Sequence, residues 1–197
     1  LWLKTESLNV SDLDAGHLDE KGWVKKWPDA SDKGNDAFQK NANQRPLYRN
    51  GGIGSLPAVR VTRGPRFLHT SNTVQTDEET IFVVLRRFSY DTGTNTLLGM
   101  TGEPYAIQSR DNPDPNVTDW AVTGYKNGVN ALAEAPALGE DPIILTARRK
   151  AGSDGFIELY KDGELMKSAS HTAGQVEGKY VIGARGDEEA PMAAYIG

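Results

Sequence analysis

Acidic and amide side chains crowd one short segment of the sequence, WPDASDKGNDAFQ, at positions 27–39. Asp29, Asp32 and Asn35 offer oxygen atoms at close spacing, and calcium binds through about six to eight such oxygens. The segment lacks a bidentate glutamate and a glycine at the offsets of an EF-hand loop. The incomplete ligand set favours a structural role, in which Asp29 and Ser31 accept hydrogen bonds from backbone N–H groups. Calcium bound by Asp29, Asp32 and Asn35 is the alternative.

A second polar segment, SRDNPDPNVTDW at positions 109–120, contains prolines that stiffen it. Loops on a rigid scaffold are favoured places for ligand binding, and aromatic rings beside this one offer flat faces to a sugar ring. A tryptophan within a strand is nonetheless more often part of the core than a binding platform. On the ligand interpretation, the binding residues are Tyr105, Arg110, Asp119, Trp120 and Tyr125.

Paired carboxylates are the third kind of chemistry to consider. A retaining glycosidase needs two carboxyl groups about 5–5.5 Å apart. The sequence contains no Glu-x-Asp-x-x-Glu segment, the strand pattern that points such acids into one cleft. Asp77, Glu78 and Glu79 are adjacent, so on a strand they face opposite ways and indicate a solvated strand entrance. We therefore predict no catalytic residue and no enzymatic activity.

Short runs rich in β-branched and aromatic residues recur between turn clusters, which predicts β-strands. The side chains above are therefore expected to lie on strands or on the loops between them. The predicted strands are 1–4, 58–61, 80–88, 96–100, 105–110, 119–125, 143–149, 156–161, 164–169 and 180–184. The segment TIFVVLRRF, at 80–88, is apolar at both odd and even positions, which predicts a central strand covered on both faces.

The clearest local signal is the hairpin in FIELYKDGELMKS, where Asp162-Gly163 suits a two-residue type I′ turn. This loop predicts that Lys161 lies opposite Glu164 and that Tyr160 lies opposite Leu165. The same register predicts Leu159 opposite Met166 and Glu158 opposite Lys167.

The strand content predicts an all-β fold in one domain over residues 1–197. A two-sheet antiparallel jelly-roll sandwich and a closed barrel both fit about ten strands. The connection at 28–56 is too long for an up-and-down barrel, so the jelly roll is the prediction.

The composition limits the classes of partner that the chain is expected to bind. The net charge is −5, with Lys and Arg interleaved among Asp and Glu, so no basic stripe is available for nucleic acid. No apolar run reaches the roughly 18 residues of a membrane span, so we expect no membrane insertion. The chain has no cysteine and opens at Leu1 without an initiator methionine or a signal-type segment, which indicates a mature or excised part of a longer protein.

The order of these segments resembles the concanavalin A-like, laminin G-like (LamG) jelly-roll superfamily. The resemblance rests on LWLK, WPDASDKGNDAFQ, RPLY, LPAVRV, TIFVVLRR, IELYKDGELM and YVIGAR, which span nearly the whole chain in the expected order. It implies a concanavalin A-like sandwich, and laminin G-like domains often carry calcium.

Two features depart from that superfamily. Ser31-Asp32 stands where relatives often have Ser-Gly, so an identical turn cannot be assumed. Relatives usually continue past a segment such as MAAYIG with one more strand, which pairs beside the first. We expect that this strand is cut away, supplied by another chain, or replaced by Tyr195 and its neighbours.

The resemblance and the missing catalytic carboxylates together indicate a non-catalytic recognition module, carbohydrate-binding, in a secreted or surface-exposed protein. Its expected partner is a glycan or a surface protein. A structural or adhesion domain of a virion, filament or cell-surface assembly is the alternative, with a neighbouring subunit at the sheet edge. A polysaccharide hydrolase or lyase that uses Asp119 and Glu103 is a further alternative.

Overall fold

The computed structural model describes residues 1–8, 16–62, 64, 66–88, 94–111, 118–126, 129–135, 141–170, 174–189 and 192–197. At 94, 103–105, 109–111, 118–126 and 129–135 the description covers the backbone alone. The described chain forms β-strands and short 3-10 turns. No helix in this part of the chain is long and apolar enough to cross a lipid bilayer.

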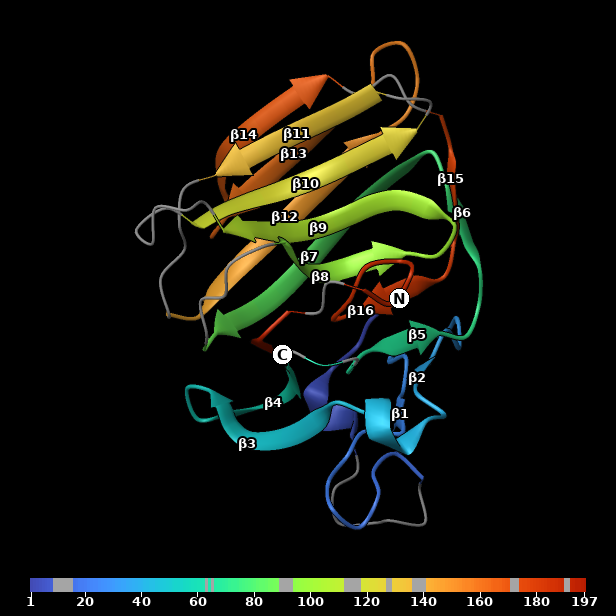
Figure 1. Ribbon diagram of the computed structural model, residues 1–197, viewed down its shortest axis with the longest axis vertical. Coiled ribbons are helices and arrows are strands. Elements are labelled where there is room, and N and C mark those ends of the chain that lie inside the picture. Colours follow the sequence, from blue (N-terminus) through green and yellow to red (C-terminus); the bar gives the residue numbers. More distant parts are fainter. Residues whose placement is uncertain are drawn as a thin grey trace.

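Two antiparallel sheets form the body of the molecule (Figure 1). In the described residues the first sheet has eight strands in the order β1-β2-β5-β16-β8-β9-β10-β11. Their bounds are β1 Lys26–Trp27, β2 Ala37–Phe38, β5 Leu68–Thr70, β16 Tyr180–Ile182, β8 Thr94–Met100, β9 Glu103–Asp111, β10 Thr118–Lys126 and β11 Val129–Ala135.

The second sheet has seven described strands in the order β14-β13-β12-β7-β17-β4-β3. Their bounds are β14 Glu164–Ser170, β13 Phe156–Lys161, β12 Ile143–Lys150, β7 Glu78–Arg87, β17 Ala194–Ile196, β4 Leu56–Val61 and β3 Leu47–Ile53. A ribbon of β6 (Val74–Thr76) and β15 (Val176–Gly178) lies at one side of the sandwich, and η1 (Thr5–Ser7) and η3 (Ala42–Gln44) are 3-10 turns. The predicted two-sheet jelly-roll sandwich is confirmed.

The hydrophobic core lies between the two sheets. Leu85 and Leu145 enter it from the seven-stranded sheet, and Leu97 and Ile107 enter it from the eight-stranded sheet; each is 1% exposed. Full burial of a side chain of this kind contributes about 1.5–3 kcal/mol. The core therefore joins the two layers and fixes the outward direction of the alternate residues on each strand.

β7 is a central strand, as predicted, because it pairs with β12 on one side and with β17 on the other. The prediction that both faces are covered is wrong. Leu85 is buried, but Phe82 is 71% exposed and Val84 is 37% exposed. In a two-layer sandwich only the inner face of a sheet packs against the other sheet, so even an apolar strand presents one face to water.

The β13–β14 hairpin has the predicted turn, with positive φ at Asp162 and Gly163. Lys161 pairs with Glu164 and Tyr160 with Leu165, as predicted. Beyond that point the predicted register is wrong, because a β-bulge shifts Leu159 opposite Lys167 and Glu158 opposite Ser168. A bulge sets two residues of one strand against one of the other, which a count outward from the turn does not include.

Several strand predictions need correction. Residues 1–4 form a single bridge from Leu3 to Asp29 instead of a strand, because the chain enters η1 at Thr5. The short strands β1, β2, β5, β6, β15 and β17 were not predicted, and neither were β3 and β11. The predictions at 143–149, 156–161 and 164–169 agree with β12, β13 and β14 to within one residue.

β17 occupies the position between β7 and β4. Ile196 pairs with Leu85 on β7 and with Val59 on β4, and the N–H of Gly197 donates to the carbonyl of Val84 at 3.0 Å. Tyr195 and its neighbours therefore form a strand within the seven-stranded sheet. β17 is three residues long, whereas β7 is ten, so β17 covers only one end of β7.

Candidate functional site

The predicted calcium segment is folded around Asp29. The Oδ1 atom of Asp29 accepts hydrogen bonds from the N–H groups of Trp2 (2.8 Å) and Ser31 (3.0 Å). Its Oδ2 atom accepts from the Ser31 hydroxyl (2.8 Å) and from the Asn35 N–H (3.0 Å). Burial would raise the pKa of Asp29, but these four hydrogen bonds outweigh burial and hold the pKa well below its usual range.

The other two predicted calcium ligands do not converge on Asp29. Asn35 directs its side-chain oxygen to the N–H of Asn72, at 2.8 Å. The Asp32 side chain is 87% exposed and lies 3.7 Å from the Lys33 ammonium. Within the described part of the chain, no group of three or more His, Cys, Asp or Glu side chains is placed to hold a metal ion.

Asp36, near the C-terminal end of the same segment, also binds its backbone. Its Oδ1 atom accepts from the N–H of Asp29 (2.8 Å), and its Oδ2 atom lies 2.6 Å from the Lys26 ammonium. Burial would raise the pKa of Asp36, and the contacts with Lys26 and Asp29 lower it on balance. The polar side chains of this segment thus organise its backbone.

The predicted ligand residues Tyr105, Arg110, Asp119, Trp120 and Tyr125 lie on β9 and β10, where their side chains are outside the described part of the structure. The backbone ladder brings some of these positions together. Asp119 is directly opposite Arg110, and Trp120 is directly opposite Ser109. Tyr125 lies at the far end of β10, opposite Asn130 of β11.

A cavity of about 780 Å³ opens beside β7. One wall is formed by residues 1–3, and the other by residues 80–84 of β7. Trp27, Leu97, Tyr180 and Ile182 of the eight-stranded sheet line it from the opposite layer, and Gly197 lies at one end. We call this cavity the edge groove. Its size is within the range of about 300–1,000 Å³ typical of ligand pockets.

The rim of the edge groove is apolar and exposed. Trp2 is 58% exposed, Phe82 is 71% exposed and Val84 is 37% exposed. Contiguous apolar surface of this kind marks interaction sites on soluble proteins.

Polar groups meet at the inner end of the edge groove. Glu79 accepts a hydrogen bond from the hydroxyl of Tyr180 and lies 3.4 Å from the Nε atom of the fully buried Arg149. Arg149 also donates to the carbonyls of Thr76 (2.7 Å) and Gly174 (3.3 Å). Burial, and then the charge of Glu79, raise the pKa of Tyr180 far above its usual range. The predicted solvated strand entrance is therefore wrong for Glu79, whose side chain is only 8% exposed and is paired with Arg149.

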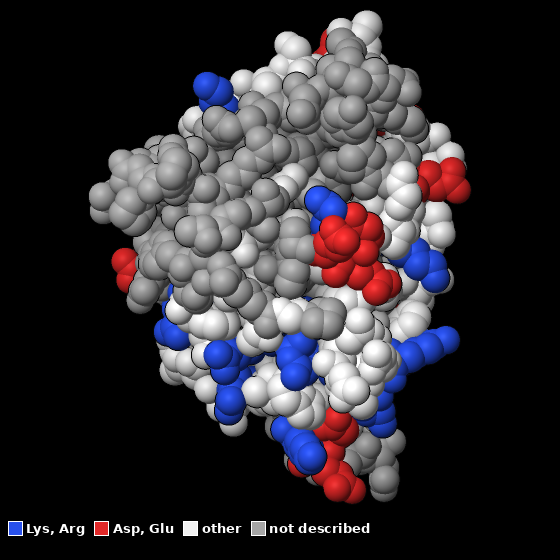
Figure 2. Space-filling view, viewed as in Figure 1, with Lys and Arg blue, Asp and Glu red and all other residues white. Residues whose placement is uncertain are grey.

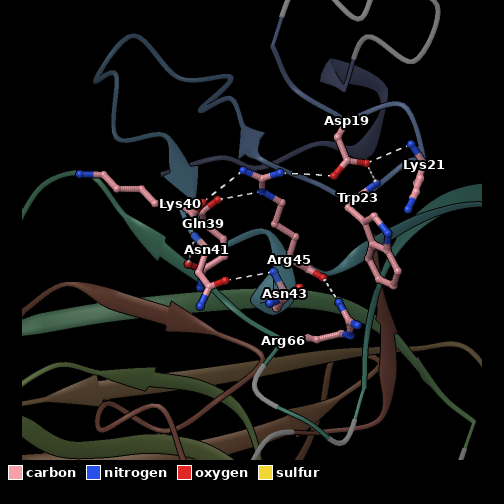
Figure 3. Close-up of polar contacts among 9 residues, drawn as sticks. All are labelled: Asp19, Lys21, Trp23, Gln39, Lys40, Asn41, Asn43, Arg45 and Arg66. Atoms are coloured by element: carbon pink, nitrogen blue, oxygen red, sulfur yellow. Dashed lines mark hydrogen bonds and ion pairs between the residues drawn. The ribbon is translucent and has the colours of Figure 1, made fainter.

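A further polar cluster surrounds Arg45, beside the strands of the sandwich (Figure 3). The Arg45 guanidinium donates to the carbonyls of Gln39 (3.1 Å) and Lys40 (3.2 Å) and pairs with Asp19 (3.3 Å). Arg66 donates to the Arg45 carbonyl and lies 4.0 Å from the ring centre of Trp23. These groups bind one another and join loops, so the cluster organises the chain around η3.

Figure 2 shows one concentration of acidic side chains at the level of β16, and Lys and Arg gathered around β3 and β4. The acidic cluster belongs to the loop after β16. Arg185 pairs with Asp187 at 2.5 Å and with Glu189 at 3.0 Å, and His69 lies 3.1 Å from Glu188. The acids of this loop are thus balanced by cationic or titratable neighbours.

Several carboxylates in the described part of the chain bind a cation or backbone N–H groups. Glu158 pairs with Arg148 at 3.0 Å and Asp154 with Lys150 at 2.5 Å, in the same way as Glu79 and Asp36 above. A general acid needs a raised pKa, but the pKa of Asp154 is lowered, chiefly by its hydrogen bond to Lys150. These contacts stabilise the charged form of each carboxylate. They therefore fit a structural role better than a role as a proton donor in catalysis.

Sequence reasoning missed the edge groove and the Glu79–Arg149–Tyr180 contacts. Glu79 is directly opposite Arg149 in the β7–β12 ladder. An acid and an arginine at inward positions of two neighbouring strands are a signal for such a pair, but only once the register is known.

Comparison with known proteins shows the fold. No protein-family model matches the chain, and no curated protein matches it. The native heptameric SAP-like pentraxin of Limulus polyphemus matches with a TM-score of 0.55 and 14% identity, over 70% of this chain and 73% of the pentraxin chain. The binding domain of Paraclostridial Mosquitocidal Protein 1 matches with a TM-score of 0.63 and 12% identity, over 87% of this chain and 45% of that chain. At such identities the likeness is one of fold.

Proposed function

We propose that residues 1–197 form a single, non-catalytic recognition module of the concanavalin A-like, laminin G-like kind, in a secreted or surface-exposed protein. Its proposed ligand is a glycan. The fold is shared with a protein that is itself a binding domain. The way in which Asp36, Asp154 and Glu79 are held by cations also supports binding over catalysis.

The observation that carries the glycan proposal is the β9–β10 ladder. It sets the carboxylate-bearing position 119 opposite the guanidinium-bearing position 110 on one face of the sheet, and the aromatic position 125 of β10 belongs to the same face. A few polar groups that fix orientation beside an aromatic surface are the usual composition of a small-ligand site. Asp119 and Arg110, with Tyr125 farther along the same face, are the proposed contact residues; Tyr105 and Trp120 belong to the opposite face of the sheet.

Retention on immobilised neutral and acidic polysaccharides tests this proposal. The unmodified protein should be retarded on at least one of them, and Asp119→Ala and Arg110→Ala should each lower the affinity about tenfold, the effect of losing roughly 1.4 kcal/mol. Asp154→Ala, which removes an exposed acid on another part of the sandwich, is the matched control and should bind like the unmodified protein. Absence of retention on every polysaccharide would refute the glycan proposal.

The hydrolase or lyase alternative is tested with the same polysaccharides. We expect no release of reducing sugar or of unsaturated product on prolonged incubation. Release by the unmodified protein that disappears in Asp119→Ala and Glu103→Ala would overturn the non-catalytic assignment.

A second candidate function is that of a structural or adhesion domain within a larger assembly. The edge groove favours it, because its lining includes the exposed side chains of Trp2 and Phe82, and exposed apolar surface marks interaction sites on soluble proteins. Light scattering across a range of concentrations tests whether copies of this chain assemble with one another. A constant monomer mass would exclude self-assembly and leave assembly through a different partner.

A further inference from the structure

We propose that Arg60 and Arg86 form a second binding site, on the outer face of the seven-stranded sheet, for the carboxylate or sulfate groups of an acidic polysaccharide. The β9–β10 positions of the proposed function belong to the other sheet, so this site is separate from them and does not depend on them. We call Arg60, Arg86 and the two aromatic residues beside them, Phe88 and Tyr195, the arginine cluster.

The register of the sheet brings the arginine cluster together. Tyr195 of β17 is directly opposite Arg60 of β4 on one side and directly opposite Arg86 of β7 on the other. Residues directly opposite each other direct their side chains to the same face of a sheet. Their neighbours along the strands, Val61 and Leu85, are buried in the core, so this face is the outer one. Two guanidinium groups therefore flank one aromatic residue at the surface of the sandwich.

Aromatic rings hold both guanidinium groups in place. The Cζ atom of Arg86 lies over the Tyr195 ring, 4.9 Å from its centre, and the Cζ atom of Arg60 lies over the Phe88 ring, 4.5 Å from its centre. The centres of the two rings are 5.0 Å apart. A guanidinium group contacts a ring through its flat face, and its N–H donors lie in its own plane. The rings therefore position the two cations without using their hydrogen-bond donors.

The charge of these two guanidinium groups is not balanced by a carboxylate. In the described part of the chain, neither Arg60 nor Arg86 forms an ion pair or donates a side-chain hydrogen bond. The Nε atom of Arg60 is buried, so its terminal Nη atoms are the donors left for a ligand. Arg148 provides the contrast, because it lies over the Phe156 ring on the same outer face but pairs with Glu158 at 3.0 Å. The planar fork of an unpaired arginine suits the bidentate binding of a carboxylate or sulfate group.

The surroundings of the arginine cluster are also cationic. Strands β3, β4 and β17 contain no Asp or Glu. The exposed Arg49 of β3 is opposite Ala58, which places it diagonally next to Arg60 on the same face. Figure 2 shows Lys and Arg side chains gathered around β3 and β4. The whole chain has a net charge of −5 and repels a polyanion, so attraction must come from a local cationic surface such as this one.

The position of the arginine cluster favours a polysaccharide over other polyanions. β4, β17 and β7 each have a neighbouring strand on both sides, so at these residues the sheet offers an acidic peptide no strand edge to pair with. A membrane surface is recognised by groups of about four to eight Lys or Arg, more than Arg49 and the arginine cluster supply. An acidic polysaccharide repeats its charges along an extended chain, and such repetition turns a few weak contacts into useful affinity.

The experiment uses the full chain and fluorescent polysaccharides, followed by anisotropy. Dextran sulfate supplies sulfate groups, polygalacturonate supplies carboxylate groups, and neutral dextran is the comparison polymer. We expect saturable binding of at least one acidic polymer, weaker binding of it at higher salt concentration, and no binding of neutral dextran. Absence of saturable binding to both acidic polymers would overturn the proposal, and so would equal binding of the acidic polymers and neutral dextran.

Three variants test the arginine cluster itself. Arg60→Gln and Arg86→Gln should each lower the affinity for the acidic polymer about tenfold, the effect of losing roughly 1.4 kcal/mol. Arg148→Gln is the matched control, because it makes the same change of charge on the same face but removes a guanidinium group that is already paired. It should bind like the unmodified protein. Equal losses in all three variants would indicate a general effect of charge and would overturn the proposal. If Arg60→Gln does not fold, the comparison of Arg86→Gln with Arg148→Gln still decides the question.

Two further measurements separate this inference from the proposed function and from an acidic protein partner. Asp119→Ala should leave the binding of the acidic polymer unchanged. Binding that is lost in Asp119→Ala but kept in both Arg60→Gln and Arg86→Gln would assign the ligand to the β9–β10 site and overturn this inference. The reverse result would support the arginine cluster and refute the β9–β10 contact residues for that ligand. Polyglutamate that binds as tightly as the better acidic polysaccharide would indicate an acidic protein as the partner, and would also overturn the inference.

Discussion

Asp29 shows what one carboxylate does in this protein. It gathers the N–H groups of Trp2, Ser31 and Asn35, which come from two separate parts of the chain. Such bonds to a charged acceptor are stronger than those to a neutral one. Replacement by Asn should therefore destabilise the fold even though the size of the side chain is unchanged.

We predict that Asp29→Asn lowers the free energy of unfolding by about 2 kcal/mol at pH 7, the scale of hydrogen bonds to a charged group. Urea unfolding followed by tryptophan fluorescence measures it. Asp32→Asn is the matched control, because Asp32 is exposed and should leave stability unchanged. Equal stability of the two variants would contradict the role given to Asp29.

The same residue predicts a pH dependence. The pKa of Asp29 is lower in the folded than in the unfolded state, so its contribution is complete above the unfolded value of about 3.9. It is lost as the pH falls through the folded-state pKa. The stability difference between the unmodified protein and Asp29→Asn should therefore be full at neutral pH and shrink in strong acid.

Calcium gives the second prediction at this scale. Both Asp29 oxygens are already engaged, and Asn35 is bonded to Asn72, so we predict little change in melting temperature between chelator and millimolar calcium. Scanning calorimetry measures it. An ion at 100 times its dissociation constant adds about 2.7 kcal/mol, so a rise of several degrees would show that calcium binds.

At the scale of elements, Glu79 connects three strands. It lies on β7, pairs with Arg149 on β12 and accepts from Tyr180 on β16, and so joins both sheets. A buried pair is costly to break from one side, because the remaining charge is left without a partner.

We predict that Glu79→Ala lowers the free energy of unfolding by about 3–5 kcal/mol, since it removes the carboxylate that pairs with the fully buried Arg149 and accepts from Tyr180. Denaturant unfolding measures the loss. Asp154→Ala, which removes the exposed partner of Lys150 from a nearby loop, should leave stability unchanged. Similar losses in the two variants would show that the Glu79 contact is no stronger than a surface pair.

Element prediction from the sequence worked where the signal is local. The Asp162-Gly163 turn is determined by residues that require positive φ, so the hairpin and its first two pairs are correct. Neither periodicity nor turn chemistry encodes the bulge between Leu159 and Tyr160, or the placement of β17, which depends on contacts between distant segments. Strands of two or three residues, such as β1 and β2, are too short to show a period.

At the scale of the whole molecule, the two-layer arrangement follows from many short, apolar-rich runs, and the sequence predicts it. Which apolar side chains lie on the outer surface cannot be predicted from the sequence in the same way. Phe82 and Val84 are as apolar as the residues of the core, and only the sheet order places them in water. The candidate site was missed for the same reason, because a groove between segments far apart in sequence needs the assembled sheet.

The exposed apolar rim predicts the solubility of the whole molecule. Phe82→Ser should raise the ammonium sulfate concentration needed for precipitation, because exposed apolar surface promotes association and this salt strengthens it. The melting temperature should change little, since the ring makes few buried contacts. Thr80→Ser, on the same outward face, is the control. An unchanged precipitation point in Phe82→Ser would indicate that the ring is shielded in solution.

The position of β17 has a consequence for how the chain folds. β4 and β7 become members of one sheet only when a strand from the far end of this sequence enters between them. Closing so large a loop costs entropy before any of its contacts form, and folds dominated by such distant pairs reach the native state slowly. During synthesis, the two parts of the seven-stranded sheet, β14-β13-β12-β7 and β4-β3, therefore remain unjoined and partly exposed until β17 has been made and pairs with both.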